Sequence, residues 1–503
     1  MATATCLSHR IGKTCPASDG GAPLRSLAVM SLLLASLPVP TASTYLIRNS
    51  RPHRQLISKD AAISKAACFG SYPRQLVVHK LQEGQHIMAD GQLDEPAWTE
   101  IPWSAPFVDI EGDLGPAPRF ETKVKMRYDN TCLWVAAYME EPHAWATQTK
   151  NNGIVYLDND FEIFVDPNGD NHYYKEVEVN ARGTSWNLLL VKPYIDGGPA
   201  VCNGTLPSMC STNYTPSSLP PSTPSSSSPP VPSWDITSSF QVGVGVDGQL
   251  NDPTKGSKSW TAEMCLPLEE YVKYEEGVNN PPRQGDYWRI NFARVEWKVK
   301  TEREGGTEVY VKDEAEPAAN WVFQPTGVAN MHLPERWGYA YFSEEAVKVT
   351  DEEGGGDSQV GGEKEGPRDP RWPVREALAQ VYEAEKIYDA LYGHAVSYTD
   401  SLNALVLQGH LSDHIAQGFC AGVPVVRRTE GGGFEATVRS LDVPGVIGHV
   451  NEERRMWFTR EDGKEEGALG VGPLPGQQQP EDQQQAASKG SGGGQKRNRM
   501  LRL

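Results

Sequence analysis

Five oxygen-bearing side chains gather within a short stretch of the chain, at Asp158, Asp160, Asp166, Asn168 and Asp170. Carboxylate and amide oxygens are the ligands that calcium prefers, and the ion takes about six to eight of them. The run D-P-N-G-D has the turn residues of a calcium loop but lacks the full EF-hand spacing. The same residues can form an Asx turn with a solvated acidic face. The sequence therefore predicts either a calcium site or a plain acidic turn.

No motif of a known enzyme class stands out. A glycosidase needs two carboxylates that face one bond, and the spacing of the 65 acidic residues singles out no such pair. The letters G-x-G-x-x-G occur at 243–248, but turn-like residues follow them where a dinucleotide site needs a helix. The motifs G-x-S-x-G and H-E-x-x-H and the phosphate-binding loop are absent from the sequence. These observations favour binding over catalysis.

The charge balance argues against one class of partner. Lys and Arg number 47 and Asp and Glu number 65 in a chain of 503 residues, so the formal net charge is −18. A protein that coats a nucleic-acid backbone needs clustered cations, and we expect no nucleic-acid partner. Hydrophobic residues make up only 38% of the chain, below the ~45–50% of a compact globular protein. Part of the chain is therefore expected to lie outside any core. As a separate prediction, we expect the protein to be a monomer.

The N-terminal region predicts entry into the secretory pathway. The apolar run LAVMSLLLASLPV at 27–39 is shorter than the ~20 residues of a membrane-spanning helix. Basic residues precede it and small residues follow, as in a secretory signal, although an uncleaved anchor or an organellar leader has similar features. Asn203 and Asn213 lie in glycosylation sequons, and Cys202 and Cys210 are near enough in sequence to bridge in an oxidising compartment. We expect a secreted or endomembrane glycoprotein.

The other cysteines after the apolar run show no zinc-binding pattern. Cys68, Cys132, Cys265 and Cys420 have no C-x-x-C spacing. Cys132 and Cys265 lie inside predicted strands, where a cysteine commonly serves as a small buried apolar side chain. We expect that packing role for both of them.

Short segments of alternating polarity predict strands through the middle of the chain, where most of the 13 tryptophans lie. Residues 122–138 form two β-rich runs around the turn pair Asp129-Asn130, which predicts a hairpin. Further strands are predicted at 160–166, 174–181, 186–191, 260–266, 287–296 and 337–342. Short strands with turn residues between them indicate a mainly β fold, an antiparallel β-sandwich of the immunoglobulin-like or jelly-roll type.

Composition shifts place the domain boundaries. The expected segments are a signal-like leader and disordered lead-in at 1–72, a sandwich at 73–345 with a Ser/Pro-rich insertion at 202–233, an acidic Gly-rich linker at 346–369, an appendage at 370–460 and a disordered tail at 461–503. Within the appendage, helical spacing of apolar residues predicts a helix at 373–391, and 434–460 predicts a short strand pair.

Several motifs in the middle region resemble those of family 9 carbohydrate-binding modules. Residues 90–98 (DGQLDEPAW) are similar to the opening DGxLDExxW, and 133–138 (LWVAAY) and 160–166 (DFEIFVD) continue the match in order. WTAE at 260–263 and NMHLPERWG at 330–338 complete it. The resemblance covers roughly 75–345. It implies a β-sandwich that binds carbohydrate, with structural calcium, related to sugar- and haem-binding domains.

The resemblance also implies residues of a sugar site. One sugar-contacting carboxylate of the family matches Glu162, and a stacking Trp six residues earlier matches Tyr156, whose ring can also stack on a pyranose. The second stacking Trp matches Met331, which has no flat face, so we expect Trp321 to take that role. Polar groups at the rim are expected from Asn330, His332 and Arg336, of which His332 and Arg336 fit a closing turn equally well.

The sequence therefore predicts non-catalytic binding of mono- or disaccharide units or polysaccharide chain ends. Two alternatives stay open. One is a glycoside hydrolase or an accessory part of one, which acts on O-glycosyl bonds. The other is a haem-binding electron-transfer domain, for which Met126, Met139, Met264 or Met331 offers an iron ligand, although a strand methionine usually packs in a core.

Overall fold

The computed structural model describes residues 69–198, 200–201, 234–347, 366–393 and 397–462. The expected insertion and most of the expected leader, linker and tail lie outside these residues. So do the sequons at Asn203 and Asn213 and the expected Cys202–Cys210 disulfide. Among the described helices, none has the length and apolar character needed to cross a membrane.

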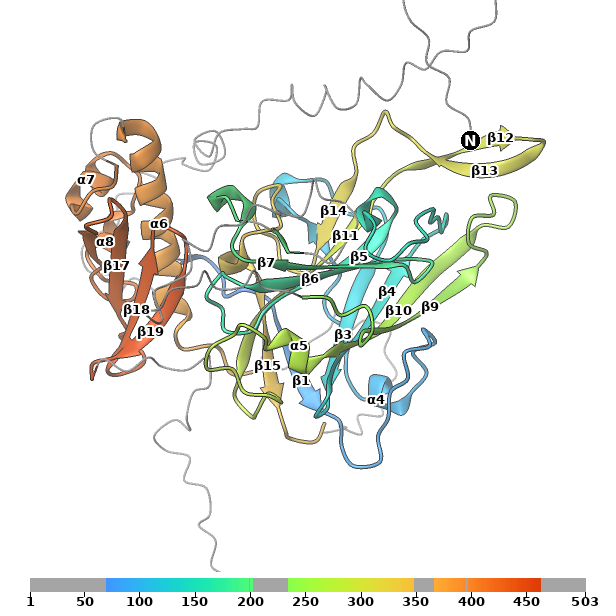
Figure 1. The fold of residues 1–503 in the computed structure, drawn as a ribbon, viewed down its shortest axis with the longest axis horizontal. Helices are drawn as coiled ribbons and strands as arrows, with labels where there is room; N and C mark the ends of the chain where they lie inside the picture. Colours follow the sequence, from blue (N-terminus) through green and yellow to red (C-terminus); the bar gives the residue numbers. More distant parts are fainter. Residues whose placement is uncertain (1–68, 199, 202–233, 348–365, 394–396, 463–503) are drawn as a thin grey trace, which may run out of the picture. The chain divides into compact units, whose positions relative to one another are not determined.

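Most strands belong to one curled 13-stranded sheet (Figure 1), with the order β8-β7-β6-β5-β11-β15-β1-β3-β4-β10-β9; β14 pairs with β11, and β2 pairs with β14. The strands are β1 Gln75–Lys80, β2 Val108–Asp109, β3 Thr122–Tyr128, β4 Cys132–Glu140, β5 Asp160–Asp166, β6 Tyr174–Asn180, β7 Ser185–Leu190, β8 Ala200–Val201, β9 Gln241–Gly248, β10 Ser257–Pro267, β11 Tyr287–Glu296, β14 Ala319–Val322 and β15 Gly338–Ser343. Strands β12 Val299–Glu304 and β13 Thr307–Lys312 form a separate hairpin.

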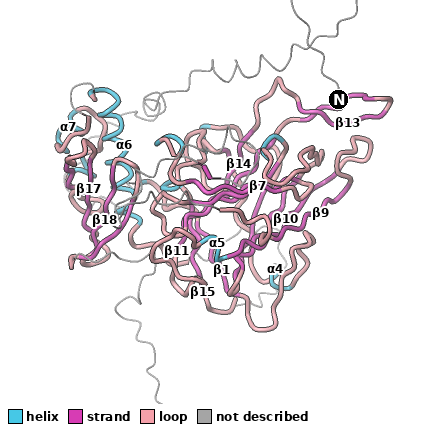
Figure 2. Tube along the Cα trace, in the orientation of Figure 1, coloured by secondary structure: helices cyan, strands magenta, loops and turns pink. Residues whose placement is uncertain are grey.

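Short helical turns connect these strands. In Figure 2, strands and loops make up most of this part of the chain, and helix is only a small part of it. The turns are α4 Pro96–Thr99, η1 Gly112–Leu114, η2 Val155–Leu157, η3 Tyr194–Asp196, α5 Leu268–Tyr271 and η5 Pro334–Arg336. Two of them, η2 and η3, carry tyrosines of the candidate site described below.

The main core lies between the two halves of the curled sheet. Val124 and Val135 of β3 and β4 pack in the same cluster as Ile163 and Val177 of β5 and β6, and all four are fully buried. Burial of apolar surface on both inner faces is what holds such a sandwich together. The predicted mainly β sandwich is confirmed.

Pairing is antiparallel at most positions, with one departure from the prediction. Strand β1 runs parallel to both of its neighbours, β15 and β3. It lies next to them in the sheet although β15 follows it by more than 250 residues. The alternation pattern of a strand sets its two faces but not the direction of its neighbours, so this arrangement required the tertiary structure.

The predicted strands agree with those of the structure to within a few residues. Strands β5 and β11 have the bounds that alternation predicted, and the 122–138 hairpin forms as β3 and β4 around its turn. Strand β9 was not predicted, because its sequence QVGVGVDG reads as Gly-rich turn or loop.

Two glycines explain why β9 has that sequence. A Cβ on Gly243 would lie 2.3 Å from the carbonyl oxygen of Ala89, and one on Gly245 would lie 2.6 Å from that of Gly91. The loop that carries the DGQLDEPAW motif therefore crosses directly over β9 and requires glycine beneath it. The G-x-G-x-x-G letters serve this close backbone approach.

Cys132 and Cys265 form a disulfide between β4 and β10. Both side chains are buried inside strands, as predicted, but the expectation that they act only as small apolar side chains is wrong. The two residues are 133 positions apart in the sequence. In the ladder between β4 and β10, Cys265 pairs with Trp134 and Cys132 pairs with Pro267, so the two cysteines lie close to each other. Only the pairing of β4 with β10 brings them together.

The C-terminal part of the described chain has a core of its own. Its elements are α6 Trp372–Tyr392, α7 Leu402–Leu407, α8 Asp413–Ala416, β16 Val425–Arg428, β17 Phe434–Arg439, β18 Val446–Asn451 and β19 Met456–Arg460. The helix at 373–391 is confirmed as α6. The predicted short strand pair is in fact a sheet of four consecutive antiparallel strands, in which β17 and β18 carry most of the contacts to α6.

Candidate functional site

Four carboxylates share one face of β5 and β6, on the side opposite the main core. Side chains alternate along each strand, so Asp160 and Glu162 of β5 face the same way as Glu176 and Glu178 of β6. Glu162 lies directly opposite Glu178 in the ladder. Each of these side chains is at least nine-tenths buried. We call these four residues the acidic cluster.

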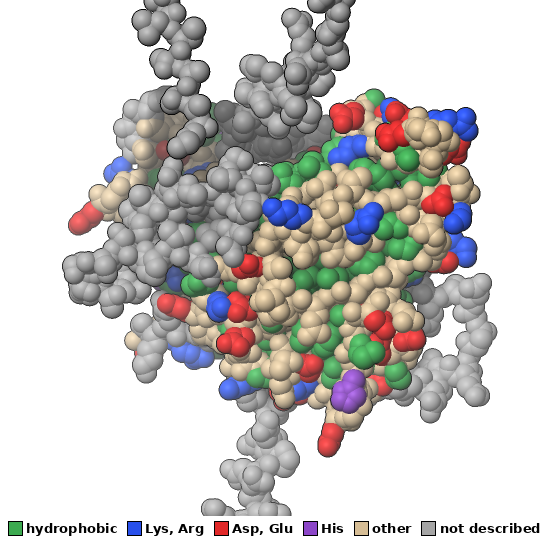
Figure 3. Space-filling view, turned by 45° about the vertical axis from the view of Figure 1, so that its right-hand side comes forward, with side chains coloured by type: hydrophobic (Ala, Val, Ile, Leu, Met, Phe, Trp, Pro, Cys, Tyr) green, Lys and Arg blue, Asp and Glu red, His purple; other side chains and the backbone are tan. Residues whose placement is uncertain are grey.

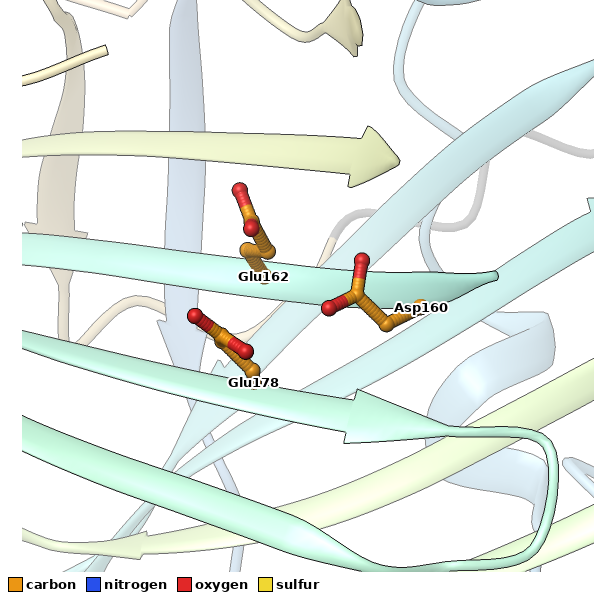
Figure 4. A group of neighbouring side chains, drawn as sticks. All are labelled: Asp160, Glu162 and Glu178. Atoms are coloured by element: carbon orange, nitrogen blue, oxygen red, sulfur yellow. The ribbon is translucent and has the colours of Figure 1, made fainter. Parts of the chain in front are cut away.

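The carboxylates of Asp160, Glu162 and Glu178 converge (Figure 4), with one oxygen from each lying within 4.8 Å of the others. The Tyr156 amide donates to Glu178 at 3.0 Å, and the Val295 amide donates to Asp160 Oδ1 at 3.3 Å. Asp160 Oδ2 and Glu176 Oε2 are buried and have no hydrogen-bond partner.

The electrostatics of the acidic cluster are dominated by burial and by like charge. Burial raises the pKa of Glu162 to about 8. Burial, followed by repulsion from neighbouring carboxylates, also raises the pKa values of Asp160, Glu176 and Glu178 well above their ordinary range. In the described part of the chain, no salt bridge joins any of the four to a lysine or arginine. The cluster therefore holds unbalanced negative charge whenever it is ionised.

Two tyrosines lie beside the acidic cluster. Tyr156 of η2 is half-buried and lies 6.0 Å, ring centroid to centroid, from Trp186 of β7. Its pKa is raised by burial and by the charges of Glu178 and other members of the cluster. Tyr194 of η3 is 43% exposed, and the pKa of its hydroxyl is raised by burial and then by Glu176. The cluster therefore lies next to the molecular surface.

His332 joins the same group of side chains. Its Nδ1 is hydrogen-bonded to the Tyr174 hydroxyl at 3.0 Å, and its ring meets that of Tyr194 edge-on at 4.6 Å. Burial lowers the pKa of His332 to about 3, so the ring is neutral at ordinary pH. Asn330 caps the turn before it, because its Oδ1 accepts a hydrogen bond from the His332 amide at 2.9 Å.

Two of the predicted sugar-site residues lie elsewhere. Trp321 is only 1% exposed and belongs to the main core. Its ring lies 5.1 Å from the Arg294 guanidinium, on the opposite face of the sheet from the acidic cluster. Arg336 forms an ion pair with Glu383 of α6 and donates to the Thr326 carbonyl at 2.8 Å. Trp321 is therefore enclosed in the core, whereas Arg336 is engaged by Glu383 and the Thr326 carbonyl.

The five predicted metal ligands do not form one site. Asp158 accepts hydrogen bonds from Thr147 and Gln148 amides and from Asn180. Asp160 belongs to the acidic cluster. Of the remaining three, Asp166 ends β5, and Asn168 and Asp170 lie in the turn after it, where Asn168 caps the Asp170 amide at 2.9 Å.

Asp166 and Asp170 converge with Glu275, which sequence spacing did not indicate. We call these three residues the turn cluster. The Lys175 ammonium pairs with Glu275, and Arg455 lies 3.3 Å from Asp170. Asp166 accepts backbone hydrogen bonds from Gly169 and Asn171 at 2.8 Å each. The carboxylates of the turn cluster therefore have cations or backbone amides of the protein as partners.

Trp186, Glu176, Glu178 and Tyr194 were not predicted as site residues. A signal for the two glutamates was present, since YKEVEVN places Glu176 and Glu178 on the face of β6 that matches Glu162 on β5. No signal marked Tyr194, because η3 approaches the cluster only through the fold.

One face of the molecule carries charges of both signs. Figure 3 shows acidic and basic side chains interspersed over one face of the molecule. Lys258 and Asp247, for example, pair at 3.2 Å on exposed side chains of β10 and β9.

The methionines considered as haem ligands take packing positions. Met126, Met139 and Met264 lie in the main core with at most 2% exposure. Met331 is 9% exposed, and its carbonyl accepts the Trp337 indole hydrogen bond at 2.8 Å. These positions match ordinary core packing of strand methionines.

Comparison with solved structures finds similar chains among carbohydrate-binding proteins. A carbohydrate binding module family 9 from Caldicellulosiruptor kristjanssonii in complex with glucose is 14% identical, covers 55% of this chain and 99% of its own, and has a TM-score of 0.32. The same module in complex with cellotriose has a TM-score of 0.31, with 14% identity over 55% of this chain and 97% of that one. A putative carbohydrate-binding protein from Bacteroides uniformis is 17% identical over 54% of this chain and all of its own, with a TM-score of 0.34.

No curated protein shows significant similarity to the chain. The family model described as carbohydrate family 9 binding domain-like matches residues 89–187. That range contains the opening motif, the β3–β4 hairpin, Tyr156 and all four members of the acidic cluster. The resemblance predicted from the motifs is thus confirmed, and residues 89–187 are the segment that matches the carbohydrate family 9 binding domain-like model.

Proposed function

We propose that this chain binds carbohydrate, without chemistry of its own, at the surface where Tyr156 and Tyr194 lie beside the acidic cluster. The observation that carries the proposal is the contact between Tyr156 and the cluster: the Tyr156 amide is fixed on Glu178, directly across the ladder from Glu162. An aromatic face beside planar hydrogen-bonding groups is what a pyranose ring requires. The match of this region to the family model supports the same function.

Titration calorimetry with glucose and cellotriose tests the proposal, since these sugars bind the similar modules. We expect Tyr156→Ala to weaken binding about tenfold, because an aromatic contact contributes roughly 0.5–1.5 kcal/mol beyond its buried area. Glu162→Gln should weaken it by a similar factor. Tyr392→Ala, which removes an exposed tyrosine of α6, is the matched control. Unchanged affinity in both site variants would refute this site.

The runner-up function is hydrolysis of O-glycosyl bonds, for which the close approach of Glu162 and Glu178 is the relevant observation. A carboxyl of raised pKa beside a second carboxylate is the pair that glycosidases use. Release of reducing ends from cello-oligosaccharides, abolished by Glu162→Gln, would establish this function. Binding without any release supports the proposal above.

The same proposal includes a secreted or endomembrane location. The Cys132–Cys265 disulfide supports it, because buried disulfides persist in oxidising compartments. The test is to recover the protein from its native source and treat it with an amidase that removes N-linked glycans. A loss of mass that disappears when Asn203 and Asn213 are both changed to Gln is the expected result. An unglycosylated, reduced protein would contradict the location.

A further inference from the structure

The turn between β18 and β19 joins the C-terminal part of the described chain to the sandwich. Asn451 fixes the turn, because its Oδ1 accepts hydrogen bonds from the Glu453 and Arg455 amides at 3.1 and 3.0 Å. The turn places Arg454 at a φ of 70°, which is uncommon for a residue other than glycine. The Arg454 carbonyl accepts a hydrogen bond from the Asn171 side chain of the sandwich at 2.9 Å. The backbone of Arg454 is therefore held in one defined position.

The Arg454 side chain joins two helical turns of the sandwich. Its Nε donates to Oδ2 of Asp196 in η3 at 2.6 Å, and its Nη1 pairs with Oε1 of Glu335 in η5. The side chains of Arg454, Asp196 and Glu335 are exposed by only 7%, 2% and 3%. Buried charges need partners of good geometry, and a guanidinium fork can serve two carboxylates at once. We call these three residues the arginine clamp.

The two turns that the clamp joins also meet through a pair of rings at the candidate site. Tyr194 lies in η3, two residues before Asp196, and His332 lies three residues before Glu335. The rings of Tyr194 and His332 meet edge-on at a centroid distance of 4.6 Å. One guanidinium from the C-terminal part therefore holds the same two segments that present these rings. Arg454 and Tyr194 both lie outside the range 89–187 that matches the family model.

We propose that Arg454 is a positioning residue of the carbohydrate site, which holds η3 to η5 and so fixes the Tyr194 ring beside the acidic cluster. The C-terminal part then contributes to binding through Tyr194 and not by a contact of its own with the sugar. Loss of the guanidinium leaves two buried carboxylates without their cation, so we expect η3 to move towards water. The effect on binding rests on the proposed function, whereas the clamp itself can be tested without a sugar.

The first experiment follows amide hydrogen exchange by mass spectrometry in the full chain without sugar. We expect exchange at 194–198 and 332–336 to become at least tenfold faster in Arg454→Ala. Arg455→Ala is the matched control and should leave both segments unchanged, because the Arg455 guanidinium lies 3.3 Å from Asp170 of the turn cluster. Arg454→Lys replaces Arg454→Ala if that variant does not fold by circular dichroism, since an ammonium lacks the fork that reaches both carboxylates. Unchanged exchange at position-454 variants, or equally fast exchange in Arg455→Ala, would overturn the clamp.

The second experiment measures affinity for cellotriose by calorimetry in a double-mutant cycle. We expect Arg454→Ala and Tyr194→Ala each to weaken binding at least fivefold. The double variant should bind as Tyr194→Ala does, because Arg454 acts through Tyr194. Losses that multiply in the double variant, or full affinity in Arg454→Ala, would overturn the positioning role. If the unmodified chain binds neither glucose nor cellotriose, the proposed function fails, and the exchange experiment still decides whether the clamp holds η3.

Discussion

The indole nitrogen of Trp98 donates a hydrogen bond to the Glu263 carboxylate at 2.6 Å. Glu263 also accepts from the Gly91 and Asp90 amides at 3.2 and 3.3 Å. Two motifs that lie 165 residues apart, DGQLDEPAW and WTAE, are therefore joined through one carboxylate. Their joint presence in the sequence has a structural cause: DGQLDEPAW supplies the donors of these buried hydrogen bonds, and WTAE supplies the acceptor.

Replacement of Glu263 by Ala should destabilise the sandwich. The change leaves the Trp98 indole and two amides without their acceptor, and each unsatisfied buried donor costs about 1–3 kcal/mol. We expect the free energy of unfolding, measured with urea, to fall by more than about 2 kcal/mol. Glu269→Ala, at an exposed position of α5, should change it by less than about 0.5 kcal/mol. Equal effects of the two changes would contradict this role.

Glu263 should also make stability depend on pH. Burial, with a smaller effect of Glu95, raises the pKa of Glu263 to about 7, although hydrogen bonds from Trp98 and the loop amides lower it. The folded state therefore holds a proton between pH 4.5 and 7 that the unfolded state releases, and its stability falls as pH rises through that window. Urea unfolding at pH 5 and pH 8 should show this decrease. In Glu263→Gln the difference between the two pH values should be smaller; an equal difference would contradict the assignment.

The glycines of β9 should not tolerate a methyl group. Gly243→Ala places its Cβ against the Ala89 carbonyl, so either the strand or the motif loop must move. We expect a fall in melting temperature and loss of protection from hydrogen exchange at 89–98. Gly431→Ala is the control, because its Cβ would meet no atom within 4 Å. A fully tolerated Gly243→Ala would show that the loop does not need this close approach.

Reduction of the Cys132–Cys265 disulfide should lower stability by about 2–5 kcal/mol, because the bridge closes a long loop in the unfolded chain. The loop separates the two cysteines by 133 residues. A Cys132→Ser, Cys265→Ser double variant should show the same loss in urea, and added reductant should then have no further effect at this site. A double variant as stable as the unmodified chain would contradict the expectation.

Trp321 should matter for stability and not for carbohydrate affinity. It packs in the main core beside Phe120 and Arg294. Trp321→Phe is expected to lower the free energy of unfolding by roughly 1–3 kcal/mol while calorimetric affinity for cellotriose stays that of the unmodified chain. A selective loss of affinity, with stability intact, would restore the sequence-based assignment of Trp321 to the sugar site.

Much of the fold follows from local pattern. Alternation in DFEIFVD and YWRINFARVE determines strands β5 and β11, because a strand with two distinct environments places successive side chains on opposite faces. The same alternation assigns Glu162 to one face of β5, together with Asp160. The family motifs then identified the kind of domain, and the matching region contains both residues.

Other features depended on pairing between distant segments. The register of β5 against β6 brings Glu178 opposite Glu162. The pairing of β4 with β10 joins Cys132 to Cys265. The register of β14 against β11 sends Trp321 into the core. The sequence alone determined which side chains share a face of their own strand. The tertiary structure decided which faces meet, because a register is set by burial summed over whole ladders, and a shift of one residue would reverse every face.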